Sequence, residues 1–274
     1  MNVNINFLRD HYWTYDKPYP YNDNITVYPV FMQDYHELMW ALECLQIDKM
    51  EFANSMDVMR NVAIIQMTNL NYLFDIISET DSDGNRTELA DVRLSQFVTF
   101  LKICLHIDPI DIQQINDDTG KISIVIVVED INKKLKIIPF TYADFDNLRK
   151  ICVHQHIPDY DDTQLSPEIK QEIARTRALQ QKNYEIATLE MRLSAYSSHY
   201  KCNKKDIFNL SVREFLINED MYDRMLNYQI YRTAESSGMV EFKEPIEHYL
   251  YRFKKKHILD MFMSLDEMED KVKT

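Results

Sequence analysis

The chain has 274 residues, of which 45% are hydrophobic and 27% charged, as in ordinary folded proteins. Its glycines are only Gly84, Gly120 and Gly238, which cannot form a phosphate-binding loop or the three-glycine fingerprint of a dinucleotide site. The formal net charge of −13 argues against a nucleic-acid partner, because phosphate binding draws on a basic surface.

The sequence lacks the marks of a membrane-spanning or secreted protein. No apolar run reaches the ~18 residues of a membrane span, and the first residues lack the basic start and apolar stretch of a secretion signal. The four cysteines lie about fifty residues apart, without paired spacing: Cys44, Cys104, Cys152 and Cys202. We therefore expect reduced thiols, a cytoplasmic location and no membrane partner.

Residues 1–27 are aromatic and polar and are predicted to form an extended arm. Such an arm needs a surface to lie on, which is either the body of the same chain or that of a partner. In the second case Trp13, Tyr15 and Tyr19 are the expected anchors, because partly exposed aromatic side chains concentrate interface energy.

Residues 28–108 are predicted to form a helical N-terminal part. Pro29 marks the start of a first helix, in which apolar residues recur every three or four positions: Phe31, Tyr35, Leu38, Leu42 and Leu45. Further helices are expected at about 56–77 and 88–106, the second of which is stopped by Pro109.

Residues 109–140 are predicted to form a small antiparallel β-meander. Three β-prone runs are separated by turns at 118–120 and 131–133. The middle run, ISIVIVV at 122–128, is too apolar to leave an open face. We therefore expect helices to cover it or a second copy of the chain to pair with it.

Residues 141–274 are predicted to form a helical C-terminal part. Thr141 and Asp144 resemble a capping box that opens a helix over 142–155, and Ser211 and Glu214 form another for 212–237. One long helix is expected near 166–200, with shorter helices near 245–255 and in the tail. The predicted fold class is therefore α+β, mostly α-helical, with a central meander between helical N- and C-terminal parts.

The second half of the long helix carries an apolar seam at three- and four-residue spacing: Ile186, Leu189, Leu193, Tyr196 and Tyr200. Such a stripe either packs within the chain or joins another helix. The half-polar helix and the strongly apolar strand both favour self-association or a partner helix, so we expect an oligomer or a bound partner.

Two stretches approach a metal-binding pattern. Residues 79–90 place Asp81, Asp83 and Gly84 as in a calcium loop, but Ala90 stands where a bidentate Glu is required, which favours a plain turn. Cys152, His154 and His156 alternate along a predicted helix, where residues two apart point away from each other, although they converge if the helix ends early. No catalytic constellation appears, so we expect no catalytic residue, no cofactor and no metal.

Two blocks of the sequence resemble uncharacterised proteins of large tailed bacteriophages of Firmicutes, which are similar to tail assembly chaperones and accessory virion proteins. The first block contains Tyr28-Pro29-Val30 with Met32 and Tyr35, followed by Leu45 and Asp48-Lys49. The second contains residues 211–215 and the stretch AESSGMVEFKEPIEHYLY at 234–251. The resemblance implies no catalytic or ligand-binding residue.

The resemblance implies a non-enzymatic phage protein that acts in tail or baseplate assembly by binding other phage structural proteins. It would work in the host cell cytoplasm or in the virion. The alternative is a phage protein that binds a host protein and inhibits or triggers a bacterial defence enzyme. Acidic mimicry of nucleic acid is disfavoured, because the acids are interspersed with lysines in most segments.

Overall fold

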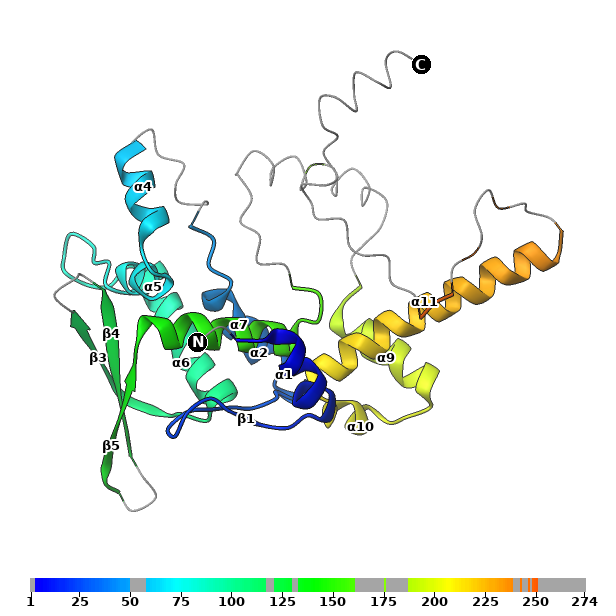
Figure 1. Ribbon diagram of the computed structural model, residues 1–274, viewed down its shortest axis with the longest axis horizontal. Coiled ribbons are helices and arrows are strands. Elements are labelled where there is room, and N and C mark those ends of the chain that lie inside the picture. The colour runs from blue at the N-terminus through cyan, green and yellow to red at the C-terminus, as the bar shows by residue number, and fades with distance from the viewer. Residues whose placement is uncertain are drawn as a thin grey trace, which may run out of the picture. The chain divides into compact units, whose positions relative to one another are not determined.

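The computed structural model describes residues 3–49, 58–116, 121–129, 133–160, 175, 187–238, 242, 246 and 248–250. The chain divides into two compact units, residues 1–216 and 217–274. In the described part, no helix is both long and apolar enough to cross a membrane. The predicted fold class is confirmed: the protein is mostly helical, with a small antiparallel sheet between helical segments (Figure 1).

The first unit begins with short elements and a helical layer. In chain order these are α1 (Ile5–His11), the 3-10 turn η1 (Trp13–Tyr15), the two-residue strands β1 (Tyr19–Pro20) and β2 (Thr26–Val27), the 3-10 turn η2 (Met32–Asp34), α2 (Tyr35–Leu45), α4 (Val58–Gln66), α5 (Asn69–Ile77) and α6 (Glu88–Leu105).

The meander and the later helices follow in the order that the sequence predicts. They are β3 (Pro109–Asn116), β4 (Ile122–Glu129), β5 (Leu135–Phe140), α7 (Tyr142–His156), α9 (Leu189–Tyr200), α10 (Lys204–Phe208) and α11 (Val212–Ser236). The predicted capping box at the start of α7 is present, with Thr141 and Asp144 capping each other's backbone. At the start of α11, Ser211 Oγ accepts the Glu214 N–H at 3.1 Å, which is one of the two contacts of the box predicted there. The predicted tail helix lies outside the described residues, as does most of the helix predicted near 245–255, whose described residues 246 and 248–250 are not helical.

The core of the first unit is centred on α6. The ring of Phe97 is fully buried and lies 5.7 Å from Phe74 of α5, 6.4 Å from Phe140 of β5 and 6.1 Å from Phe145 of α7. The meander therefore packs one face against α6 and α7, through buried side chains that alternate along β4 with half-buried ones.

The segment 1–27 is not an extended arm, and that prediction is wrong. It contains α1, η1 and a short β1–β2 hairpin in which Tyr19 pairs with Val27. Asn4 caps α1 by accepting the Phe7 N–H at 3.1 Å, so local capping favours a helix over an extended chain. Tyr21 fastens the hairpin to α7: its hydroxyl donates to Asp144 at 2.9 Å, and its burial raises the pKa of Tyr21 to about 12.

Two predicted helices are shorter than expected for the same reason. The helix predicted at 56–77 breaks at Thr68, and the helix predicted near 166–200 does not run through Thr188; both residues have φ −67° and ψ 158°. Each threonine hydroxyl accepts a backbone N–H three residues later, from Asn71 at 3.1 Å and from Met191 at 3.3 Å. These hydroxyls begin new helices, because the cap bond requires an extended residue at that position. Most of 166–186 lies outside the described residues.

The second unit contains the greater part of α11 and the residues described after it. Tyr228 of α11 lies 5.1 Å from the ring of His248 and 5.8 Å from that of Tyr249, and Tyr231 lies 5.8 Å from Phe242. Gly238, with φ +68°, follows the end of α11 in the left-handed conformation that glycine adopts readily. Aromatic contacts thus hold Phe242, His248 and Tyr249 against α11.

Candidate functional site

The aromatic anchors predicted in the N-terminal segment are mostly engaged inside the first unit. Trp13 is buried, and the Arg213 guanidinium lies 5.2 Å from the centre of its ring. Tyr19 packs against the core and meets the Tyr12 ring edge-on at 5.0 Å. Tyr15 is 65% exposed, with Lys17 above its ring. Of the three anchors, only Tyr15 presents a largely exposed surface.

The apolar seam of α9 also packs within the first unit. Leu193 and Tyr196 are buried in its core, and the Tyr196 ring lies 5.1 Å from Phe215. Leu189 is partly buried against the same core. Tyr200 is exposed and rests on Tyr196 at 4.4 Å, while Ile186 lies outside the described residues. Of the two alternatives for the seam, these positions favour packing within the chain.

The two sequence blocks that carry the phage resemblance meet in space. Phe31 pairs with Ser211 in an antiparallel bridge, the Met32 N–H donates to Leu210 O and the Val212 N–H donates to Val30 O, both at 2.9 Å. We call this contact the junction: residues 28–32, the end of α7 at 152–156 and residues 210–213. The junction thus joins the start of the first block to residues 211–213 of the second.

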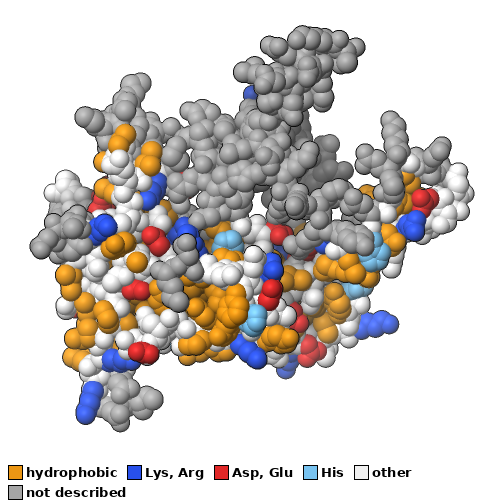
Figure 2. Space-filling view, viewed as in Figure 1, with side chains coloured by type: hydrophobic (Ala, Val, Ile, Leu, Met, Phe, Trp, Pro, Cys, Tyr) orange, Lys and Arg blue, Asp and Glu red, His pale blue; other side chains and the backbone are white. Residues whose placement is uncertain are grey.

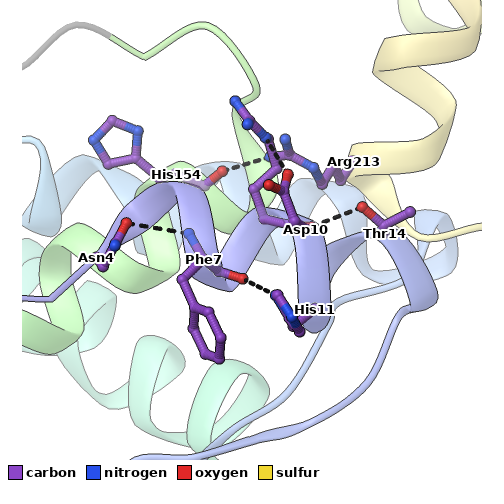
Figure 3. Close-up of polar contacts among 8 residues, drawn as sticks. Asn4, Phe7, Asp10, His11, Thr14, His154 and Arg213 are labelled. Atoms are coloured by element: carbon purple, nitrogen blue, oxygen red, sulfur yellow. Dashed lines mark hydrogen bonds and ion pairs between the residues drawn. The ribbon is translucent and has the colours of Figure 1, made fainter.

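Arg213 closes the junction from α11 (Figure 3). Its Nη1 donates to the carbonyl oxygens of His154 at 2.6 Å and Gln155 at 3.4 Å, at the C-terminal end of α7. A cation suits that position, because the last carbonyls of a helix have no partner within the helix and carry partial negative charge. The contacts of Arg213 with the end of α7 and with Trp13 therefore indicate a structural role for this side chain.

His156 holds the other side of the junction as a neutral ring. The Val30 N–H donates to its Nε2 at 3.0 Å, which leaves the proton on Nδ1, and Nδ1 donates to Cys152 O at 2.8 Å. Complete burial, together with the nearby Arg213 charge, lowers the pKa of His156 to about 4. Both ring nitrogens are thus occupied, so His156 is not available as a metal ligand in this conformation.

Lys49, in the Asp48-Lys49 pair of the first block, also has a structural role. Lys49 is buried, its ammonium donates to Met67 O just after α4, and desolvation lowers its pKa. Arg149 Nη1 donates to Leu45 O, at the end of α2, at 3.2 Å. Both cations therefore donate to a backbone carbonyl at or just after the C-terminal end of a helix.

The two metal-like stretches do not form a metal site in the part of the chain that the structure describes, where no group of three or more His, Cys, Asp and Glu side chains could hold an ion. Asp81 Oδ1 accepts the N–H groups of Asp83 and Asn85, each at 2.9 Å, in a turn that Gly84 completes at φ +81°. Cys152 is fully buried beside Cys104, and His154 meets the Tyr160 ring edge-on. The turn interpretation of residues 79–90 is consistent with this geometry.

The outer face of the three-stranded sheet is the candidate interaction surface. In the β3–β4–β5 register, Val125 lies opposite Pro139 and Val127 opposite Ile137, so these side chains share one side. Ile115 and Leu135 lie on the same side at its two ends. We call this set the outer face: Ile115, Val125, Val127, Leu135, Ile137 and Pro139.

The side chains of the outer face are exposed to an unusual degree for their type. Leu135 is 70% exposed, Ile137 62% and Ile115 51%. The opposite side of the same strands is buried, with Ile124 facing Phe140 and Ile126 facing Ile138 in the core. Hydrophobic side chains are also visible around the sheet in the space-filling view (Figure 2). A central strand that is apolar on both sides is typical of a sheet covered on both sides.

The edges of the sheet are less suited to binding than its outer face. Among the described residues, β3 and β5 each pair with β4 alone, which leaves one edge of each strand free. Pro139 removes a backbone donor from β5, and a register shift between Pro109 and Asp111 interrupts β3. Proline and bulges both disfavour the addition of another strand. A partner is therefore expected on the outer face.

The sequence pointed to this surface only indirectly. The run ISIVIVV indicated a strand that needs cover on both sides, but the residues of β3 and β5 that complete the outer face depend on strand register, which periodicity alone does not give. Comparison with protein-family models, with curated proteins and with solved structures finds no match to this chain.

Proposed function

We propose that this chain is a non-enzymatic bacteriophage protein that acts in tail or baseplate assembly by binding another protein through the outer face of its sheet. The observation that carries the binding role is the exposure of Leu135, Ile137 and Ile115 on strands whose opposite side packs Ile124, Ile126, Ile138 and Phe140 into the core. The phage setting rests on the resemblance of residues 28–49 and 211–251 to phage proteins.

The chemistry of the outer face supports a protein partner. Val125 and Val127 form its centre, with Pro139 and Ile137 opposite them on β5 and the polar Gln113 and Asp111 opposite them on β3. Burial of such aliphatic area stabilises a complex by roughly 25 cal/mol per Å² before the costs of association. The partner is another phage structural protein or a second copy of the chain, and a homo-oligomer is one expected form.

The test compares two lysine substitutions at equally exposed apolar positions. Ile137 is 62% exposed on the outer face, and Met191 is 61% exposed on α9, away from the sheet. Lysine is tolerated on edge strands, so Ile137→Lys is expected to fold. Affinity capture of the tagged protein from infected cells, with mass spectrometry of the captured proteins and of purified virions, should recover tail or baseplate proteins with wild type and Met191→Lys. Ile137→Lys should lose them.

Two outcomes would contradict the proposal. Equal recovery of tail proteins by Ile137→Lys and wild type would exclude the outer face as the binding surface. Recovery of only a host nuclease or NADase, and never of tail proteins, would exclude the assembly role and favour the anti-defence alternative. Light scattering of the purified wild type separates self-association from binding to a different chain.

A further inference from the structure

A groove of about 360 Å³ lies between α4, α5 and the start of α6. None of its lining residues belongs to the outer face of the sheet. Its volume is within the range of small-ligand pockets, ~300–1,000 Å³. The side chains that line it are Ala63, Ile64 and Met67 on the α4 side, Tyr72, Asp75, Ile76 and Glu79 on the α5 side, and Leu89 of α6.

The lining combines an apolar wall with two acids. Asp75 belongs to α5 and Glu79 lies two residues after the end of that helix, and both line the groove. Desolvation raises the pKa of Asp75, and the side chains of both Asp75 and Glu79 are exposed to solvent at the groove. Among ion pairs between described residues, neither carboxylate takes part, and Glu79 accepts only a long hydrogen bond from Thr87 Oγ1 at 3.5 Å.

Charge complementarity selects the occupant. An anion is repelled by the two carboxylates, and a neutral apolar group leaves them without a counter-charge. An aliphatic chain that ends in a cation satisfies both parts of the lining, because lysine and arginine side chains cover apolar surface with their stems while their charged ends meet carboxylates.

The segment just before α4 cannot supply such a cation, because residues 50–57, MEFANSMD, contain no lysine or arginine. Arg60 of α4 is three residues before Ala63 and four before Ile64 in sequence, so it is the cation of the same chain that an experiment has to separate from an external one.

We propose that the groove binds an arginine or lysine side chain of a partner protein, with the aliphatic stem against Ile64, Met67 and Leu89 and the cationic group beside Asp75 and Glu79. The site is independent of the outer face, and its test uses the purified chain alone. Failure of one proposal therefore leaves the other intact.

The test titrates the isotope-labelled full chain with n-butylguanidinium, which mimics the arginine side chain, and follows backbone amide shifts by NMR. We expect saturable shifts at the amides that line the groove, and none with pentanoate, whose charge is opposite. The Asp75→Asn, Glu79→Gln double variant should weaken binding about tenfold or more, as expected for loss of charge-assisted hydrogen bonds. Asp83→Asn removes an equally negative side chain from the α5–α6 connection, outside the groove lining, and should bind like wild type.

Three results would overturn the proposal. Equal binding of 1-pentanol would show that the carboxylates do not select a cation. Equal weakening by Asp83→Asn would show general attraction to an acidic protein. Binding that appears only in an Arg60→Gln variant would show that the groove holds an arginine of its own chain. The dispersion of the amide spectrum checks that each variant is folded.

Discussion

The junction and the outer face of the sheet reverse the usual placement of polar and apolar side chains. At the junction, His156, Gln155 and Arg213 are buried, and the side chains of His156 and Arg213 hydrogen-bond to backbone groups of Val30 and of residues 152–155. On the outer face, Leu135 and Ile137 are more than half exposed. Buried polar groups and exposed apolar surface are the informative exceptions to ordinary burial.

The contrast separates folding from binding. The side chains of His156 and Arg213 have hydrogen-bond partners inside the chain, so they fix how residues 28–32 and 210–213 attach to α7. The exposed side chains of the outer face, Ile115, Leu135 and Ile137, bury little area within the described chain. The proposed contact lies on strands outside residues 28–49 and 211–251.

The largest expected effect tests the two sides of β5. Phe140 is fully buried against Phe97 and Phe145, and Ile137 is exposed on the opposite side. We expect Phe140→Ala to lower the free energy of unfolding by about 3–5 kcal/mol, and Ile137→Ala to change it by less than about 0.5 kcal/mol. Urea denaturation of both variants measures the difference. A similar loss in both would mean that the outer face is already covered within the chain.

The next effect concerns Arg213. Removal of its side chain leaves the carbonyls at the end of α7 without their donor and Trp13 without its cation, so Arg213→Ala should cost about 3 kcal/mol of unfolding free energy. Arg213→Lys keeps the charge and should restore part of the loss. Arg232 has an ion pair with Glu235 on the exposed surface of α11, and Arg232→Ala should show no measurable change in the same denaturation experiment.

The smallest of the three effects is a pH dependence from His156. Its pKa is lowered from 6.5 to about 4 in the folded chain. Between these values the unfolded chain binds a proton that the folded chain does not, so stability is fully present above pH 6.5 and falls as the pH decreases towards 4. At pH 5 the loss from this group should be about 2 kcal/mol relative to pH 7.

His156→Gln isolates that contribution. Glutamine can still accept the Val30 N–H but does not titrate, so the variant should be less stable than wild type at pH 7 and lose less stability between pH 7 and pH 5. Unfolding free energies at a series of pH values measure both slopes. Parallel slopes would show that the pH dependence comes from other groups.

The sequence alone determined those features of the fold that depend on residues close together in the chain. Thr141 with Asp144 and Ser211 with Glu214 fix the starts of α7 and α11, because a cap requires only residues three positions apart. The β-branched runs around residues 118–120 and 131–133 likewise predicted the meander, since hairpin pairing joins neighbours in sequence. Thr68 and Thr188 show the limit, because apolar periodicity continues past a cap that ends one helix and begins another.

The tertiary structure decided what depends on residues far apart in the chain. Trp13 and Tyr196 are aromatic residues of the kind that anchor interfaces. Only their contacts with Arg213 and Phe215 show that both side chains are packed inside the first unit. His156 resembled a metal ligand until Val30, more than a hundred residues earlier, supplied the donor to its Nε2. The outer face required the register of three strands to become visible. Burial and partnership are properties of contacts between distant segments, and periodicity reports only neighbours along the chain.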